Sequence, residues 1–337
     1  MGAPSIALTE LSIRNFRGIE SLDLDFRGPD GLPNRLVVLA GPNGCGKTSV
    51  LEAALLLVGG ERLLTGPAGR SAIRRGAPEC AIRGLLASDG AEEDRIARLS
   101  RGDATGEFEI TSSEQGRSNR AQPLKDIWYF SSWRAPSLVG AVDPTVGGRG
   151  RRPAKTDKNR LRNVKQFLVN EAAIERFEGT FESLGRYSGI MREINEAWRA
   201  FYPGAGESFS VKIVKSIEST GGSFDVYFRT PEGEFIEVDL LSAGQLELFL
   251  FLSALALNEN RSGIIFIDEP ELHLDPQWHR LVLRTLMELQ SRAQFIVATH
   301  SPEVYDEAKS YERHFLVPAD DPRARLWRSS ARAPQGV

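Results

Sequence analysis

The chain has 337 residues, of which 41% are hydrophobic and 26% are charged, and its formal net charge is −3. Such a composition can bury a full core without disulfides or metals, and it excludes a generally basic, nucleic-acid-binding surface. The two cysteines, Cys45 and Cys80, exclude a disulfide framework and a cysteine-rich zinc site. Few cysteines, no secretory leader and apolar runs too short to cross a bilayer together predict a cytoplasmic protein without membrane contact.

In the first part of the chain, the pattern predicts strands around one helix. Residues 6–26 alternate apolar and polar positions, as a two-stranded meander does, and residues 34–40 contain a short apolar run typical of a buried strand. A helix is expected from Lys47 to about Val58, because a glycine-rich turn precedes it and two glycines follow it. Short strands are expected between residues 60 and 130.

The second part predicts more helix. Gly-, Pro- and Arg-rich residues 147–165 indicate a loop, residues 160–201 a helical region, and residues 208–228 a hairpin. The remaining expected elements are helix 245–258, strand 264–267, helix 277–290 and strand 294–298. We therefore expect a first lobe at 1–135, an insert at 136–235 with the basic loop, helices and hairpin, a second lobe at 236–318, and a tail at 319–337.

A phosphate-binding loop is predicted at residues 41–48. Their sequence GPNGCGKT fits the pattern GxxxxGK[ST] and lies between a buried strand and a helix, as that pattern requires. The glycines let backbone N–H groups approach phosphate oxygens, Lys47 brings a positive charge to the β- and γ-phosphates, and the Thr48 hydroxyl is a ligand for Mg²⁺. The predicted contacts to ATP from this loop are Asn43, Gly44, Cys45, Gly46, Lys47, Thr48 and Ser49.

Two adjacent carboxylates, Asp268 and Glu269, end the apolar strand predicted at 264–267. In a parallel α/β sheet, ligands gather at the carboxyl ends of the strands, where the phosphate loop also opens. Adjacent strand residues point to opposite sides, so the two side chains should have different roles. We expect Asp268 to hold Mg²⁺ and Glu269 to act as general base for the attacking water.

Residues 241–245, LSAGQ, precede a strongly apolar helix and resemble the LSGGQ signature of ABC ATPases, with Ala243 replacing one glycine. The resemblance implies that Ser242, Gly244 and Gln245 contact ATP held by a second subunit. Asp275, in the stretch LHLDP, resembles the D-loop residue at the dimer seam. His300, at the end of the strand FIVATH, resembles the switch histidine that contacts the γ-phosphate.

Near the N-terminus, residues 11–19, LSIRNFRGI, resemble the opening segment of the ABC-ATPase branch that contains the SMC, RecF-like and OLD ATPases. The resemblance adds Arg14 and Arg17 to the expected nucleotide contacts. It implies an α/β ABC-ATPase head with a P-loop, a mixed sheet on a RecA-like core, an N-terminal antiparallel β-subdomain and a helical signature subdomain. The head is expected to lack a long coiled coil and a nuclease domain.

The chain departs from this family where a Q-loop glutamine should follow the strand at 126–130. Residues 131–134 read SSWR instead. The departure puts the identity of the Q-loop residue in doubt. Arg134, Gln122 and Gln166 are the alternatives for this role.

The basic loop, residues 149–165, has two interpretations. Its excess of Arg and Lys predicts either a solvated surface loop or a contact to nucleic-acid phosphates without sequence readout. A platform of stacking aromatic residues for single strands is not indicated.

The expected activity is ATP hydrolysis by a homodimer that closes on ATP. By resemblance, its conformational switch regulates a separate effector protein, a nuclease or toxin in an anti-phage system. The alternative is a RecF-like DNA-binding ATPase of repair and maintenance, and a transporter subunit ranks third.

Overall fold

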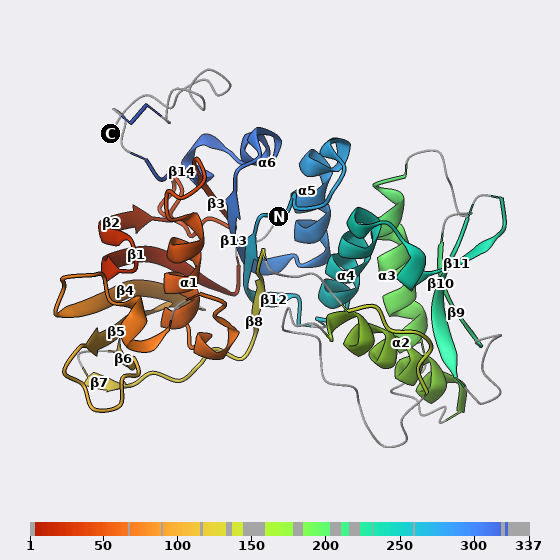
Figure 1. The fold of residues 1–337 in the computed structure, drawn as a ribbon, viewed down its shortest axis with the longest axis horizontal. Helices are drawn as coiled ribbons and strands as arrows, with labels where there is room; N and C mark the ends of the chain where they lie inside the picture. Colours follow the sequence, from red (N-terminus) through yellow and green to blue (C-terminus); the bar gives the residue numbers. More distant parts are fainter. Residues whose placement is uncertain are drawn as a thin grey trace. The chain divides into compact units, whose positions relative to one another are not determined.

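The computed structural model describes residues 4–66, 68–88, 90–114, 117–132, 137–143, 159–177, 185–202, 210–215, 223–230, 232–258, 260–317 and 321–322. The chain forms two compact units that interleave along the sequence. Unit 1 comprises Met1–Ser132, Ser262–Pro270 and Ser291–Val337, and unit 2 comprises Trp133–Arg261 and Glu271–Gln290. The range 236–318, expected as one lobe, therefore contributes to both units (Figure 1).

Unit 1 contains a five-stranded sheet in which every neighbouring pair is parallel, in the order β14-β3-β13-β12-β8. Strands β3, β8, β12 and β13 are almost entirely buried, as strands covered on both faces are. Because the strands are parallel, their carboxyl ends meet at one edge. The bounds are β3 Leu36–Ala40, β8 Ile127–Phe130, β12 Ser262–Asp268, β13 Arg292–Thr299 and β14 Arg313–Phe315.

Unit 1 also contains a six-stranded antiparallel sheet, in the order β2-β1-β4-β5-β6-β7. It begins with the expected meander, in which Ile13 of β1 pairs with Leu22 of β2. The antiparallel and parallel strands thus belong to separate sheets. The bounds are β1 Ile6–Phe16, β2 Ile19–Asp25, β4 Glu79–Ser88, β5 Ala91–Ser100, β6 Glu109–Glu114 and β7 Arg117–Arg120.

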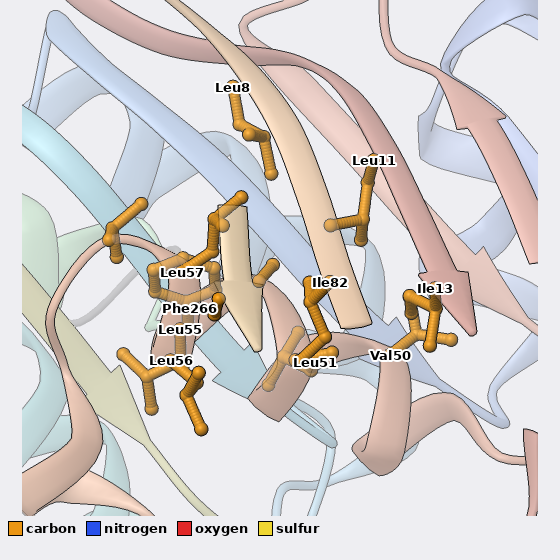
Figure 2. Packing of buried hydrophobic residues seen from close by; sticks show 14 of the residues in the cluster. Leu8, Leu11, Ile13, Val50, Leu51, Leu55, Leu56, Leu57, Ile82 and Phe266 are labelled. Carbon is orange, nitrogen blue, oxygen red and sulfur yellow. The ribbon is translucent and has the colours of Figure 1, made fainter. Parts of the chain in front are cut away.

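Helix α1 (Lys47–Leu57) is the centre of the unit 1 core. It contacts strands of both sheets, and its residues from Val50 to Leu57 are buried on every side. Figure 2 shows α1 residues packed beside Leu8 and Ile82 of the antiparallel sheet and Phe266 of the parallel sheet. Each such aliphatic side chain contributes about 1.5–3 kcal/mol by its burial. This packing fixes the start of α1, and therefore the phosphate loop, on the parallel sheet. Unit 1 also contains helix α6 (Pro302–Glu307).

In the described residues of unit 2, four α-helices accompany a three-stranded sheet of order β11-β10-β9. The helical region predicted at 160–201 forms two helices, α2 and α3, and the predicted hairpin is β9 paired antiparallel with β10. Helix α4 is buried along nearly its whole length, in keeping with its apolar sequence. The bounds are α2 Arg160–Phe177, α3 Arg186–Arg199, α4 Ala243–Ala256, α5 His279–Leu289, β9 Ser210–Lys215, β10 Phe224–Arg229 and β11 Phe235–Glu237. Within the described ranges, none of the helices combines the length and the apolar character needed to cross a bilayer.

Candidate nucleotide-binding site

The phosphate loop connects β3 to α1 in unit 1. Gly44 and Gly46 have φ angles of 80° and 99°, in the left-handed region that favours glycine. Gly46 immediately precedes α1 and provides no side chain to cap the helix. The first N–H groups of α1 are therefore suited to an external anion, and the dipole of the helix favours negative charge at this end.

Lys47, the first residue of α1, directs its ammonium group back onto the loop. Its Nζ atom donates to the carbonyl oxygens of Gly41 at 2.8 Å and Pro42 at 3.2 Å, and the residue is 6% exposed. A lysine held in this way is placed before any phosphate arrives. Binding of a phosphate would replace these neutral carbonyl acceptors by an anionic oxygen, which attracts the ammonium group more strongly.

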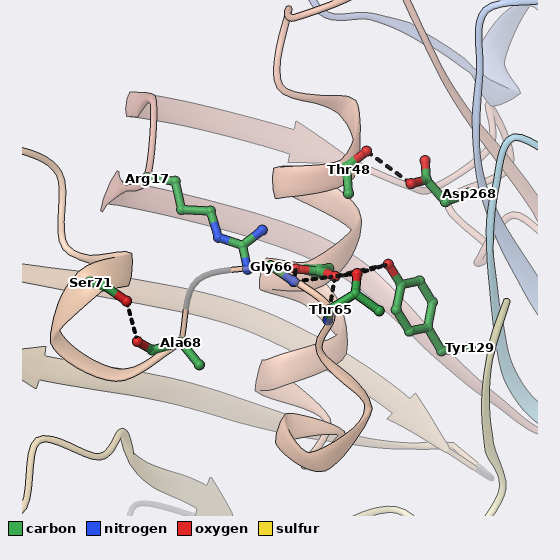
Figure 3. Close-up of polar contacts among 9 residues, drawn as sticks. Arg17, Thr48, Thr65, Gly66, Ala68, Ser71, Tyr129 and Asp268 are labelled. Atoms are coloured by element: carbon green, nitrogen blue, oxygen red, sulfur yellow. Dashed lines mark hydrogen bonds and ion pairs between the residues drawn. The ribbon is translucent and has the colours of Figure 1, made fainter. Parts of the chain in front are cut away.

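Asp268 is the last residue of β12, and one of its carboxylate oxygens accepts hydrogen bonds from two hydroxyl groups. Thr48 Oγ1 lies 2.9 Å and Ser132 Oγ lies 3.0 Å from Asp268 Oδ2, and Figure 3 shows the Thr48 contact. One carboxylate and two hydroxyls are hard oxygen ligands, which suit Mg²⁺. Among the described residues, no group of three or more His, Cys, Asp or Glu side chains is placed to hold a metal. This donor set fits a Mg²⁺ ion that takes few protein ligands and completes its shell with phosphates and water.

Glu269 and His300 lie together at the carboxyl edge of the same sheet. Glu269 has φ 56°, unusual for a residue with a side chain, and its N–H donates to the carbonyl oxygen of Ala298 at 2.8 Å. His300 Nδ1 lies 3.4 Å from Glu269 Oε1. Asp268 thus contacts Thr48, whereas Glu269 contacts His300. A backbone outlier of this kind is often found at functional sites.

Sequence reasoning missed Ser132. It lies just after β8, where a Q-loop glutamine was expected, and its hydroxyl contacts the Mg²⁺-suited oxygen of Asp268. The available signal was its position after a strand of the parallel sheet. Of the alternatives, Gln122 is exposed, Gln166 is bonded to Asp143 and Asn170, and Arg134 lies outside the described residues.

Arg14 and Arg17 are each paired with a carboxylate in the structure. Arg14 makes a bidentate contact to Asp23 on β2, at 2.8 Å to both oxygens, and its side chain is 44% exposed. Arg17 bonds to Glu52 on α1 at 2.5 Å. Their contact to a nucleotide stays a prediction.

Glu52 is a fully buried hydrogen-bonding centre on α1. Its Oε1 atom accepts from the Thr65 N–H at 2.9 Å, the Thr65 hydroxyl at 2.6 Å and the Tyr129 hydroxyl at 2.9 Å. Figure 3 shows Thr65, Tyr129 and Arg17 gathered at this point. Burial alone would raise the pKa of Glu52, but the hydrogen bonds from Thr65 and the charge of Arg17 outweigh it and hold that pKa below its usual range.

We expect Glu52→Gln to lower the free energy of unfolding at neutral pH by about 3 kcal/mol, because it leaves Arg17 without its buried carboxylate. Since the pKa of Glu52 is lower in the folded state, the stability from its charge is present above the usual glutamate pKa and is lost as the pH falls. Denaturant titrations at pH 7 and near pH 4 should therefore show the difference between the two proteins shrinking. Glu10→Gln, at the surface pair with Arg27, is the control and should cost less than about 1 kcal/mol. Equal costs for both variants would contradict this account.

The signature residues lie in unit 2, at the start of α4. Ser242 is the N-cap residue: its hydroxyl accepts from the Gln245 N–H at 3.3 Å, and Gln245 Oε1 accepts from the Ser242 N–H at 3.1 Å. This reciprocal arrangement is a capping box, which stabilises the first turn of the helix. Ser242 itself is exposed.

Gly244 allows the D-loop to approach α4 within unit 2. A Cβ atom at this position would lie 2.4 Å from the carbonyl oxygen of His273, so no larger residue fits without moving the backbone. Asp275 follows shortly after and caps the short helix η5 (Pro276–Trp278), with Oδ1 accepting from the Gln277 N–H at 2.9 Å. The signature and the D-loop are thereby held as one local structure.

Part of the predicted basic loop is buried, which corrects the expectation for two of its charges. Arg160 is fully buried on α2 and lies 2.6 Å from Glu247 on α4. Lys165 is also buried; it lies 2.6 Å from Asp225 and contacts Asp239. These two cations stabilise unit 2 and are not available to a nucleic acid. Arg162 is exposed, and residues 149–158 of the loop lie outside the described residues.

Residues 36–306 match the protein family described as "AAA domain, putative AbiEii toxin, Type IV TA system". The Septu protein PtuA of Bacillus thuringiensis is 23% identical over 90% of this chain and 74% of that protein. The DNA replication and repair protein RecF of Pectobacterium atrosepticum is 42% identical, but over only 28% of this chain and 24% of that protein. The crystal structure of an SMC head bound to the C-winged helix domain of ScpA has a TM-score of 0.62 at 14% identity, covering 90% of this chain and 92% of that one.

These similarities confirm the fold predicted from the sequence. The likeness to the SMC head extends over nearly the whole chain, so it includes the elements of both units. The family match begins at β3, before the phosphate loop, and ends after His300. The chain therefore belongs to this family of AAA domains, and it is an ATPase with the fold of an ABC/SMC-type head.

Proposed function

We propose that the chain hydrolyses ATP·Mg²⁺ at the phosphate loop of unit 1 and uses the cycle to regulate a separate effector protein. The observation that supports the site most strongly is the convergence of Thr48 and Ser132 on Asp268, beside the contact between Glu269 and His300. Both sets lie at the carboxyl edge of the parallel sheet, where α/β proteins bind their ligands.

In this proposal, the residues divide the chemistry of phosphoryl transfer. The Glu269 carboxylate accepts a proton from the water that attacks the γ-phosphorus, while the bond from that phosphorus to the bridging oxygen of ADP breaks. Lys47 offsets the charge on the β- and γ-phosphates, and His300 orients Glu269 and contacts the γ-phosphate. Thr48, Asp268 and Ser132 would hold Mg²⁺, which supplies further positive charge to the phosphates.

The proposal includes a head-to-tail homodimer in which two ATP molecules are enclosed. The signature of one subunit, at Ser242, would close on the ATP held by the phosphate loop of the other. Support comes from the exposed N-terminus of α4, which combines a serine hydroxyl with helix N–H groups and so suits an anion. Asp275 would lie along the seam. ATP would favour the closed dimer, and hydrolysis would return it to the open state.

The effector is proposed to be a nuclease or toxin in an anti-phage defence system of the cytoplasm. The family description, which names a putative toxin and a type IV TA system, supports a toxin-related effector. The solved SMC head, which is bound to a domain of ScpA, offers a precedent for a partner protein on this fold. The alternative is a RecF-like DNA-binding ATPase, favoured by the shorter but closer similarity to RecF.

A pull-down of the full chain from its native host, with and without ATP, distinguishes the two proposals. We expect one partner protein to be recovered in an amount that depends on ATP. The control is a pull-down with the Lys47→Ala variant, for which the amount of recovered partner should not depend on ATP. Recovery of the chain alone, together with strong stimulation of its ATPase activity by DNA, would replace effector regulation by the RecF-like function.

A further inference from the structure

The hydroxyl of Tyr202 contacts the signature from the end of α3. Tyr202 lies in the turn that follows α3, and its OH accepts a hydrogen bond from Gln245 Nε2 at 3.0 Å. Both residues belong to unit 2. The contact joins two segments that are 43 residues apart in the sequence. None of the roles proposed above for the ATP site uses it.

The contacts around the Gln245 amide allow only one orientation of its oxygen and nitrogen. A backbone N–H can only donate, so the atom of Gln245 that faces the Ser242 N–H must be the oxygen, Oε1. The amide nitrogen then faces Tyr202, which provides an acceptor. Ser242 Oγ also lies 3.1 Å from Gln245 Oε1 and can donate to it. The two ends of one amide therefore connect Tyr202 to the backbone and the hydroxyl of Ser242.

The Tyr202 ring is itself held firmly. It stacks on Trp198 of α3, with 5.1 Å between ring centroids and 23° between ring planes. Its other neighbour is Trp278 of η5, edge-on at 5.3 Å. The backbone N–H of Trp278 donates to the Asp275 carbonyl at 2.8 Å, so the Tyr202 ring packs against the segment that contains the predicted D-loop residue. Burial raises the pKa of Tyr202, so the hydroxyl stays protonated at neutral pH.

We propose that Tyr202 is a positioning residue for the signature: it fixes the Gln245 amide and, through it, the hydroxyl of Ser242. The end of α3 thereby controls how well the signature closes on ATP. The inference rests on the proposed role of the signature in the ATP-bound dimer.

The test is Tyr202→Phe, which removes one oxygen atom and keeps the ring between the two tryptophans. We expect ATPase kcat and ATP-dependent dimer formation to fall about threefold to tenfold, the usual effect of losing one hydrogen bond between neutral groups. Nucleotide affinity of the monomer should not change, because Tyr202 is not part of the phosphate loop. Tyr227→Phe is the matched control, since it removes a hydroxyl from a buried tyrosine of the same unit without touching Gln245.

A double-mutant cycle separates positioning from a general structural role. If Tyr202 acts through Gln245, then Tyr202→Phe should have no further effect on kcat and dimer formation once Gln245 has been replaced by alanine. Equal losses in the wild-type and Gln245→Ala proteins would overturn the inference, as would a wild-type kcat for Tyr202→Phe.

Ser242→Arg shows which of the two proposals has failed. If this variant is inactive while Tyr202→Phe is fully active, only the inference about Tyr202 is wrong. If Ser242→Arg hydrolyses ATP at the wild-type rate, the proposed role of the signature is wrong, and the inference fails with it.

Discussion

Replacing Glu269 with glutamine is expected to reduce ATP hydrolysis by about 10²–10⁴-fold, the usual contribution of a general base. The amide keeps the shape of the side chain but cannot accept the proton of the attacking water. Because Lys47, Thr48 and Asp268 are unchanged, ATP should still bind. Steady-state phosphate release and equilibrium binding of a fluorescent ATP analogue measure the two effects separately.

The same variant should accumulate as a dimer in the presence of ATP, because the step that opens the closed state no longer occurs. Size-exclusion chromatography coupled to light scattering would detect the doubled mass. Glu303→Gln is a suitable control: it replaces a carboxylate near the same edge, which accepts from Ser301 Oγ at 2.7 Å and has no proposed part in hydrolysis. Wild-type turnover by Glu269→Gln would exclude Glu269 as the general base.

The sequence was sufficient to predict the parts of the site whose structure depends on residues that are adjacent in the chain. A phosphate loop needs a strand, several glycines, a lysine and a helix in direct succession. The sequence around residues 41–48 has these parts in that order, so it predicts the loop without reference to distant residues. Asp268 could be predicted in the same way, because an apolar strand that ends in a carboxylate places that group at the ligand-binding edge of a parallel sheet. The contact of Thr48 with Asp268 then follows from the order of the strands.

What the sequence could not predict depends on partners that are distant along the chain. Arg160 and Lys165 occur in a basic stretch, and nothing nearby indicates that Glu247 and Asp239 will neutralise them in the interior. The local charge density therefore predicted that these two side chains would be at the surface, whereas in the fold they form buried ion pairs. Helix α2 begins at Arg160, as the expected helical region does, but the exposure expected for these two side chains is wrong.

Ser132 and Glu52 were missed for a related reason. A serine after a strand is common, and it gains meaning only when β8 pairs with β12 and brings its hydroxyl to Asp268. Glu52 is the one polar residue between Val50 and Leu57 of α1, and a single acidic residue in such a stretch usually marks the solvent side. Its burial becomes acceptable only because Arg17, Thr65 and Tyr129 arrive from three other segments.

The second large effect is expected for Lys47→Ala, which removes the positive charge that faces the β- and γ-phosphates. Nucleotide affinity should fall by about two orders of magnitude, the loss expected when a charged hydrogen-bond partner is deleted. Ser242→Arg should behave differently: the monomer keeps its nucleotide affinity, but the bulky cation blocks closure of the dimer. Each variant alone should therefore be inactive in hydrolysis, for reasons that lie in different units of the chain.

Mixing these two inactive variants tests whether the signature acts on the partner's ATP. In a mixed dimer, one site combines the intact phosphate loop of the Ser242→Arg subunit with the intact signature of the Lys47→Ala subunit. An equal mixture that exchanges subunits freely should regain about a quarter of the wild-type activity, since half of the dimers are mixed and one of their two sites is complete. Lys47→Ala mixed with Glu269→Gln is the control. Both lesions affect the same unit 1 site, so each site of that mixed dimer carries one of them and no activity should return. If the first mixture remains as inactive as the second, the two motifs do not complement each other across a dimer, and the head-to-tail arrangement is wrong.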